Sequence, residues 1–264
     1  MNNALRAVWA FRGFVLTSVK REFQAKYRNS LLGATWTVIQ PLSMILVYTV
    51  IFSHMMKSKL PGVEGGFAYS IYLCAGVLTW GLFVEIVSRA QTVFLDNANL
   101  IKKLSFPKLC LPLIVVLNAL LNFVIIFALF LGFLLAVGLF PGWVALAMLP
   151  VLLIQVMFAI GLGIVLGVFN VFFRDVGQLF AVVINFWFWF TPIVYPANTL
   201  PAELQTWLTL NPMAALVGAY QQIFVHGHAP DWASLAPVTV LAVVLCALGA
   251  QLFQRHAGEM VDEL

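Results

Sequence analysis

The sequence is poor in charged residues. Aspartate, glutamate, lysine and arginine together make up 9% of its 264 residues, whereas soluble domains carry about 25%. Apolar residues make up 62%, and several apolar runs reach the roughly 20 residues that cross the hydrocarbon core of a bilayer. The composition excludes a soluble globular domain and predicts a polytopic membrane protein.

Motifs for nucleotide binding and hydrolytic catalysis are missing as well. No lysine follows a glycine, so the phosphate-binding loop GxxxxGK[ST] is excluded, and no GxS triplet occurs. Cys74, Cys110 and Cys246 lie far apart in apolar segments and are predicted to be buried free thiols. His226 and His228 have no further candidate ligands nearby. The sequence predicts no catalytic residue, no metal site and no cofactor held by this chain.

The alternating segments of about ten residues that a membrane-spanning barrel needs are also absent. The apolar runs are continuous, as in VLNALLNFVIIFALFLGFLLAVGLF, and such runs cross a bilayer as helices, whose backbone groups bond internally. The fold class is predicted to be all-α, with six transmembrane helices. Their expected positions are residues 33–54, 69–90, 111–139, 143–172, 178–195 and 233–253.

Basic residues are divided unequally between the two sides that these spans define. With the N-terminus in the cytoplasm, twelve of the fourteen lysines and arginines fall on the cytoplasmic side, and only Lys57 and Lys59 fall outside. Because cytoplasmic loops carry the excess of basic residues in membrane proteins, both termini are predicted to be cytoplasmic.

Two segments outside the spans are unusually apolar. Residues 1–29 place apolar side chains at helical spacing among basic residues, which predicts an amphipathic helix in the cytoplasmic membrane interface. A single six-helix domain is expected to follow, at residues 30–264. Within it, prolines divide the apolar segment 196–232 into pieces of roughly 10–14 residues, a length typical of re-entrant or interfacial helices. Two re-entrant helices on the exterior side are predicted, near residues 201–210 and 213–225.

The acidic residues near the membrane each have a basic neighbour. Glu85 precedes Arg89 by four residues on a predicted helix, and Asp175 directly follows Arg174. An ionisable residue in a span is a functional candidate, but residues four apart on a helix also pair with each other and extend toward water. Structural ion pairing and a role in substrate or conformational coupling both remain open.

Aromatic residues are in excess, with 23 phenylalanines, 8 tryptophans and 6 tyrosines. In the second span Tyr72, Trp80 and Phe83 fall on one helical face, and NFWFWFTPIVYP (residues 185–196) ends the fifth span. Such rings pack against lipid or other helices without further function. Rings beside amides and hydroxyls also suit a sugar, whose C–H faces stack on rings, so both interpretations remain open.

Small residues recur every four positions in the fourth span, at Ala159, Gly163 and Gly167. This row indicates close helix packing, either within the subunit or between two copies.

The segment NLIKKLSFPK, residues 99–108, gathers three lysines among apolar residues on the predicted cytoplasmic side. We predict a short helix there, capped by Asn99 and ended by Pro107. The apolar residues of this helix are expected to contact a partner protein. The lysines suit either acidic residues of that partner or lipid headgroups, and the sequence does not decide between them.

Several motifs occur together in one order: YRNSLLGATWTVIQPLSMILVYTVIFS, LIKKLSFPK, and FRDVGQL followed by NFWFWFTPIVYP. They resemble the polysaccharide-export permeases of the ABC transporter superfamily, above all those for O-antigen, and next those for capsule and teichoic acid. The resemblance covers nearly the whole chain. It implies a transporter subunit rather than an enzyme, in a homodimer bound to two copies of a separate ATPase that holds ATP and Mg. It also implies a polysaccharide on polyprenyl pyrophosphate as cargo, exported across the bacterial inner membrane.

The resemblance implies roles for three groups of residues. The ATPase-coupling group is Leu100, Ile101, Lys102, Lys103, Leu104 and Phe106, with Arg174 and Asp175 as a second contact. The group near the lipid pyrophosphate or membrane headgroups is Lys20, Arg21, Lys26 and Arg28. Candidates for the glycan path, chosen by helical face, are Trp36, Tyr72, Trp80, Trp187, Trp189 and Tyr195.

Two other functions remain open. One is an ABC permease for small drugs or lipids, which matches the aromatic and polar residues less well than a sugar exporter. The other is a membrane-embedded glycosyltransferase or acyltransferase, which needs a catalytic carboxylate or histidine facing a cavity. Membrane lipids are expected partners, and nucleic acid is not.

Overall fold

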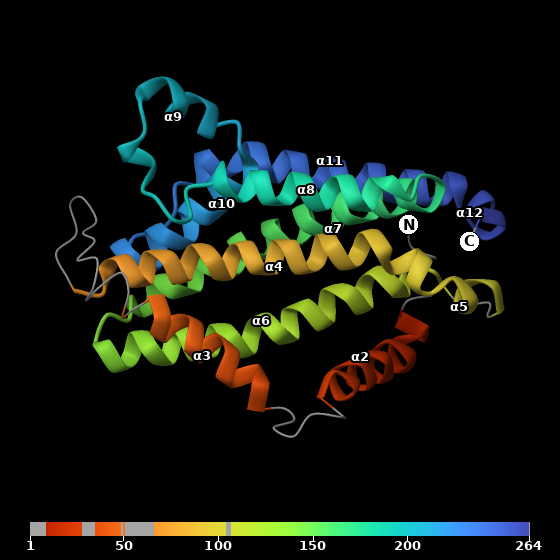
Figure 1. Ribbon diagram of the computed structural model, residues 1–264, viewed down its shortest axis with the longest axis horizontal. Helices are drawn as coiled ribbons and strands as arrows, with labels where there is room; N and C mark the ends of the chain where they lie inside the picture. The colour runs from red at the N-terminus through yellow and green to blue at the C-terminus, as the bar shows by residue number, and fades with distance from the viewer. Residues whose placement is uncertain (1–8, 28–34, 49, 51–65, 104–106, 264) are drawn as a thin grey trace.

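The computed structural model is a bundle of long helices that run along the longest axis of the molecule (Figure 1). The structure describes residues 9–27, 35–48, 50, 66–103 and 107–263. These residues form helices, turns and irregular segments, with no β-strand among them. For the described part of the chain, the predicted helical class is confirmed.

Four helical segments are long and apolar enough to cross a membrane. They correspond to the second, third, fourth and sixth predicted spans: α4 (Ala68–Asp96), α6 (Cys110–Val137), η3 (Gly142–Ala147) continuing into α7 (Met148–Phe172), and α11 (Trp232–His256). Two further helices are shorter: α3 (Trp36–Tyr48) and α8 (Asp175–Trp189). The prediction for α3, residues 33–54, extends into residues outside the described ranges. Six spans therefore stay a prediction.

Helix α8 ends at Trp189, six residues before the predicted end of the fifth span. The next residues turn back: the Thr191 N–H donates to the carbonyl of Phe188 at 3.1 Å, and the Thr191 hydroxyl donates to the carbonyl of Trp187 at 2.8 Å. Pro192 follows, which lacks an N–H and disfavours helical geometry at the residue before it. Proline chemistry therefore ends the helix, although the apolar run continues.

Helix α7 lies at the centre of the bundle, between α4 and α11, because small residues let the backbones approach. A Cβ added at Gly163 would lie 2.5 Å from the Cβ of Ala90, and one at Gly167 would lie 2.7 Å from the Ala90 carbonyl oxygen. Toward α11, a Cβ at Gly161 would lie 2.7 Å from the backbone N of Cys246. The row of small residues thus packs α7 against α4 within one chain.

Aromatic rings attach α8 to this centre. The rings of Phe83 and Phe158 stack with centroids 5.6 Å apart, and Trp187 of α8 meets Phe83 edge-on at 5.3 Å. Trp80 contacts the ring of Phe188 at 5.7 Å. These pairs stabilise packing beyond the area that they bury.

The two ends of the bundle carry different short elements (Figure 1). At one end lie α5 (Ala98–Lys103), α12 (Glu259–Glu263) and the α7–α8 turn, with α2 (Arg12–Tyr27) beside α6. The Lys108 Nζ donates to the carbonyl of Ala257 at 3.0 Å and joins the start of α6 to the C-terminal segment. This end carries most of the described basic residues and corresponds to the predicted cytoplasmic side.

The opposite end holds the short elements predicted between the last two spans. They are η4 (Ala197–Thr199), α9 (Ala202–Leu208), α10 (Pro212–Gln221) and the π-helical turn η5 (Gln222–His226). Helix α10 packs against α4 and includes the buried residues Met213, Leu216 and Tyr220. Helix α9 stands away from the bundle (Figure 1). Two short helices do occur where the sequence predicts them, and their re-entry into a membrane stays a prediction.

Candidate functional site

The predicted contact segment near residue 100 does form a short helix, α5. It begins at Ala98, so Asn99 lies inside the helix and the predicted cap is wrong. The carbonyl of Asn97 instead accepts the N–H groups of Leu100 and Ile101, each at 3.0 Å. The Asn97 side chain donates to the carbonyl of Val93 at 2.8 Å and fixes the corner between α4 and α5.

The apolar residues of α5 pack at least in part against other helices of the same subunit. Ile101 is 6% exposed and belongs to the same buried cluster as Phe253 of α11 and Met260 of α12. Leu100 is half-buried, whereas Lys102 is exposed. The Lys103 side chain, Leu104 and Phe106 lie outside the described residues. Of the predicted coupling residues described in α5, Lys102 alone has an exposed side chain.

The second predicted coupling contact is a surface turn. Arg174 and Asp175 are both exposed between α7 and α8, at the same end of the bundle as α5. No ion pair joins them in the described part of the chain. Asp175 instead lies in the first turn of α8, where a carboxylate is favourable beside the positive end of the helix dipole.

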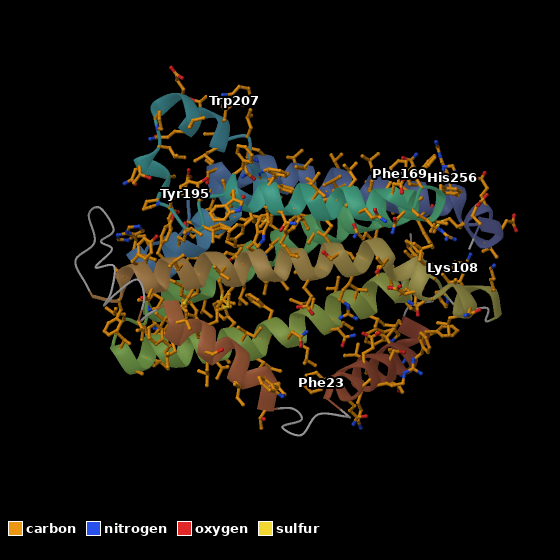
Figure 2. The ribbon with its side chains drawn as sticks, viewed as in Figure 1. Phe23, Lys108, Phe169, Tyr195, Trp207 and His256 are labelled. Carbon is orange, nitrogen blue, oxygen red and sulfur yellow. The ribbon has the colours of Figure 1, made fainter. Side chains whose placement is uncertain are left out.

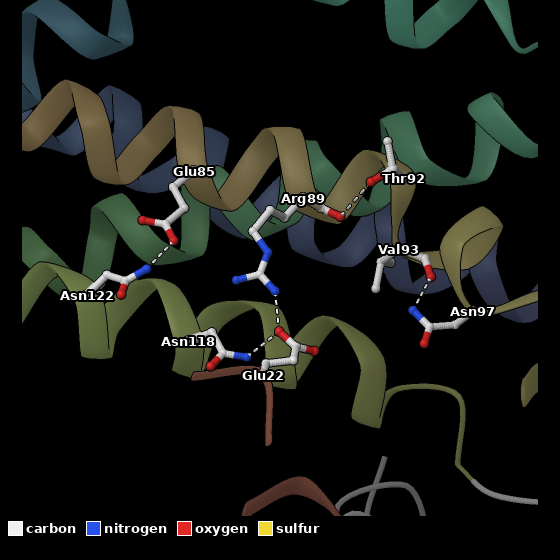
Figure 3. Close-up of polar contacts among 8 residues, drawn as sticks. All are labelled: Glu22, Glu85, Arg89, Thr92, Val93, Asn97, Asn118 and Asn122. Atoms are coloured by element: carbon white, nitrogen blue, oxygen red, sulfur yellow. Dashed lines mark hydrogen bonds and ion pairs between the residues drawn. The ribbon is translucent and has the colours of Figure 1, made fainter. Parts of the chain in front are cut away.

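The acidic and basic residues of α4 do not pair with each other. Figure 3 shows that Arg89 contacts Glu22 of α2, and that Glu85 accepts a hydrogen bond from the Asn122 side chain of α6 at 2.7 Å. Of the two interpretations left open for these residues, pairing of Glu85 with Arg89 is therefore not what the structure shows. The actual partner of Arg89 is 67 residues away in the sequence, so helical spacing had no means of identifying it.

An aromatic groove of about 830 Å³ lies between the C-terminal end of α8 and α9. It brings together three of the predicted path residues, Trp187, Trp189 and Tyr195, with Trp207 of α9. Figure 2 shows Tyr195 and Trp207 at this end of the molecule, far from Lys108 and His256. Trp207 was missed as a site residue, because an isolated tryptophan near a predicted membrane boundary is typical of an interface belt.

The other predicted path residues do not line this groove. Tyr72 and Trp80 are each 7% exposed. The Tyr72 hydroxyl lies 2.9 Å from both the carbonyl of Pro192 and the carbonyl of Tyr195, so it holds the loop after α8. Trp36 is exposed on α3. Tyr72 and Trp80 thus pack against α8 and its loop, and Tyr72 also lines a second groove beside α9.

Asn211 organises the groove wall, and sequence reasoning missed it. Its Oδ1 accepts from the Trp187 Nε1 at 2.8 Å and from the Met213 N–H at 3.0 Å, and its Nδ2 donates to the Phe190 carbonyl at 3.0 Å. One side chain therefore caps α10 and fixes the end of α8. The signal was the Asn-Pro pair, because asparagine is a preferred cap and proline is favoured in the first helical turn.

The groove offers aromatic faces and few charged groups. The Tyr195 hydroxyl donates to the carbonyl of Trp189 at 2.7 Å. On the other side of α9, a second groove of about 770 Å³ is lined by polar side chains including Asn198, Gln205 and His226. Stacking surfaces and hydrogen-bonding side chains thus lie side by side around α9.

The basic residues of α2 lie at the opposite end. Lys20 and Arg21 are exposed, whereas the Lys26 side chain and Arg28 lie outside what the structure describes. Arg21 lines a polar cavity of about 270 Å³ between α2, α4 and α6, together with Arg89 and Asp96. The cavity thus holds both basic and acidic side chains.

Comparison with known proteins identifies relatives along the whole chain. The family described as "ABC-2 type transporter" matches residues 14–225. The chain is 32% identical over 266 residues to the "O-antigen export system permease protein RfbA" of Myxococcus xanthus, covering 100% of both chains. It is 27% identical to a protein of that name in Klebsiella pneumoniae, over 89% of this chain and 88% of the relative. It is 18% identical to the "Polysialic acid transport protein KpsM" of Escherichia coli, over 91% and 92%.

Proposed function

Because the chain belongs to the ABC-2 type transporter family, we propose that it is the membrane-embedded permease subunit of an ATP-driven polysaccharide exporter. The cargo is a polysaccharide on polyprenyl pyrophosphate, with O-antigen the first candidate and capsule the next. The observation that carries this proposal is the full-length similarity to an O-antigen export permease. The subunit is a transporter component and holds no catalytic residue of its own.

The proposed assembly contains two copies of this chain and two copies of a separate ATPase, which binds ATP and Mg. Helices α3 and α8 serve as short spans, which gives six, after an interface helix within residues 1–29. The exposed apolar residues Leu179 and Val182 of α8, which lie outside the aromatic groove, support contact with a second copy. The basic end faces the cytoplasm of a bacterial cell and the membrane is the inner one, in agreement with the bias of basic loops.

The ATPase contacts the end of the bundle where α5 and the α7–α8 turn are exposed. The proposed docking surface comprises Leu100, Lys102, Lys103, Leu104 and Phe106, with Arg174 and Asp175 as the second contact. Ile101, which is buried with residues of α11 and α12, acts from inside: it fixes α5 to the bundle, so that a push on α5 is passed to α4 and α11.

The glycan passes the aromatic groove at the other end. Trp187, Trp189 and Tyr195 offer ring faces to sugar C–H groups, while Tyr72 and Trp80 support the groove wall from behind. Trp36, which is exposed on α3, is a further candidate for a ring that contacts the glycan. Lys20, Arg21, Lys26 and Arg28 neutralise the lipid pyrophosphate at the cytoplasmic interface.

The main experiment is co-expression with the candidate ATPase, followed by ATP hydrolysis with and without the lipid-linked glycan. Hydrolysis is expected to rise with the glycan. The double variant Leu104→Asp/Phe106→Asp is expected to lose co-purification of the ATPase, whereas Leu139→Asp, an exposed residue at the other end, retains it. Normal co-purification of the double variant contradicts the coupling surface. Stimulation by small lipids or drugs instead of the glycan indicates the alternative permease function.

The groove is tested separately. Trp189→Ala, in the groove, is expected to reduce glycan-stimulated hydrolysis severalfold without changing thermal stability, because this side chain is exposed. Trp143→Ala, exposed in η3 outside the groove, is the matched control and is expected to behave as the parent. Equal effects of the two substitutions argue against a glycan path along α8.

A further inference from the structure

Helix α2 is attached to the bundle by an apolar contact with α6. Val15 and Val19 are its fully buried apolar residues, and they form one cluster with Cys110 and Ile114 of α6. Partly buried apolar residues pack against this cluster: Phe14 of α2 and Leu113, Leu117 and Leu121 of α6. Leu16, on another face of α2, is exposed. An element that buries few apolar side chains separates from a fold at low cost.

The Glu22 side chain of α2 contacts both α4 and α6. The Oε2 atom of Glu22 meets the Arg89 guanidinium of α4 and accepts from the Asn118 Nδ2 of α6 at 2.7 Å (Figure 3). No other ion pair joins α2 to the bundle in the part of the chain that the structure describes. The Arg89 and Glu22 side chains are 37% and 42% exposed and line a cavity together with Arg21 and Asp96, and partly exposed ion pairs are weak and screened by salt.

The space next to this contact is hollow. The cavity of about 270 Å³ between α2, α4 and α6 is lined by Ser18 and Arg21 of α2, and by Thr92 and Asp96 of α4. It also reaches Leu100 of α5. Side chains therefore do not fill the α2–α4 boundary, and a displacement of α2 breaks little packing there.

We infer that Glu22, Arg89 and Asn118 form a latch that positions α2 on the bundle, and that α2 swings away from α6 when the latch opens. Glu22 acts through Arg89 and Asn118, so it is a positioning residue. Its role in export rests on the proposed function: opening moves the basic residues Lys20 and Arg21 relative to α4, whose end leads directly into α5. The C-terminal half of α4 contacts α2 through Arg89 and leads into α5. A movement of α5 is therefore expected to move α2 as well.

The chain contains its own reporter for this motion. Cys110 is 0% exposed and lies in the cluster that Val15 and Val19 cover, so displacement of α2 uncovers its thiol. The other cysteines are removed as Cys74→Ala and Cys246→Ser, because serine retains a donor for the Met157 carbonyl that Cys246 contacts. The measurement is the rate of Cys110 labelling by a water-soluble maleimide, with the subunit in lipid nanodiscs.

Glu22→Gln and Arg89→Gln are expected to raise the labelling rate roughly three- to ten-fold, as loss of one partly exposed charged contact implies. The exchange Glu22→Arg/Arg89→Glu is expected to return the rate toward the parent value, which general damage to the fold would not do. The matched control is Glu85→Gln, which alters the neighbouring α4–α6 contact with Asn122 but touches no residue of α2. It is expected to leave the rate unchanged.

The salt dependence of the labelling rate gives a second measurement. Because salt screens the Glu22–Arg89 ion pair, high salt is expected to speed labelling of the parent and to have little effect on Glu22→Gln. Equal rates for Glu22→Gln and the parent, equal acceleration by Glu85→Gln, or failure of the charge exchange to slow labelling each overturn the latch. These measurements use the subunit alone, so failure of the export proposal leaves them valid. In the complex with the ATPase, nucleotide is expected to change the rate, and a constant rate overturns the link to export only.

Discussion

The two halves of α4 contact the rest of the bundle through different chemistry. In the first half, Tyr72 and Trp80 use a hydroxyl and rings to hold α8 and its loop. In the second half, Glu85 and Arg89 contact amide and carboxylate groups of α6 and α2, and Ala90 meets the glycines of α7. The first set is neutral and shielded, whereas the second includes a partly exposed ion pair. One helix thus joins an end that is held by neutral, buried contacts to an end that is held partly by charge.

Removal of the Asn211 side chain is expected to have the largest effect, because it contacts both the end of α8 and the start of α10. Asn211→Ala removes the cap of α10 and leaves the Trp187 Nε1 without its acceptor, which together cost about 2–4 kcal/mol. Asn211→Asp keeps the acceptor oxygens and is expected to retain more stability. Thermal unfolding in a fixed detergent, followed by tryptophan fluorescence, measures both variants. A melting temperature for Asn211→Ala equal to that of the parent argues against this role.

Close backbone approach in the second half is tested at Gly163. Gly163→Ala places a methyl group 2.5 Å from the Cβ of Ala90, and overpacking of this kind costs about 1–3 kcal/mol. Gly132→Ala, which meets no atom within 4 Å, is the control. Ala90→Gly is expected to restore part of the loss in Gly163→Ala, so a double-mutant cycle with no interaction energy contradicts the contact.

The Tyr72 hydroxyl tests the neutral contacts of the first half. Tyr72→Phe leaves the carbonyls of Pro192 and Tyr195 without this donor, at a cost of about 1 kcal/mol. The expected sign is destabilising, with faster proteolysis of the loop after α8. Tyr220→Phe removes a buried hydroxyl that has no partner among the described residues, and its unfolding is expected to be unchanged or slightly shifted to higher temperature.

The smallest effect is expected at Glu85. Glu85→Gln keeps an oxygen that accepts from the Asn122 Nδ2, so stability changes by less than about 0.5 kcal/mol and its salt dependence stays that of the parent. Melting temperatures at low and high salt measure this directly. A large loss in Glu85→Gln alone means that the charge of Glu85, rather than its hydrogen bond, stabilises the second half of α4.

The sequence predicted elements better than it predicted partners. Long apolar runs specify spanning helices whatever surrounds them, so α4, α6, α7 and α11 lie close to their predicted positions. The boundary of α8 was misplaced, because an apolar run continues past Trp189 while Pro192 ends the helix. Ile101 was expected on a docking surface and is buried instead, because an apolar residue of a short helix is equally suited to a partner or to its own bundle.

Partner choice between distant residues needed the tertiary structure. Arg89 has an acidic neighbour four residues away, yet it pairs with Glu22, since α2 and α6 bring that carboxylate to its guanidinium. The row of glycines in α7 predicted close packing without naming the helix it meets. Trp80 and Trp189 were both candidates for the glycan path, yet Trp80 is buried and Trp189 lines a groove.

By itself the sequence determined that the chain is helical and membrane-embedded, that its basic residues gather on one side, and that it resembles a family of export permeases. These properties follow from composition, run length and motif order, which are local along the chain. The tertiary structure alone decided which aromatic residues form a wall and which are packing, and which carboxylate neutralises Arg89. Those outcomes depend on how helices cross in space, because a contact energy is set by distance and solvent exposure and not by separation along the chain.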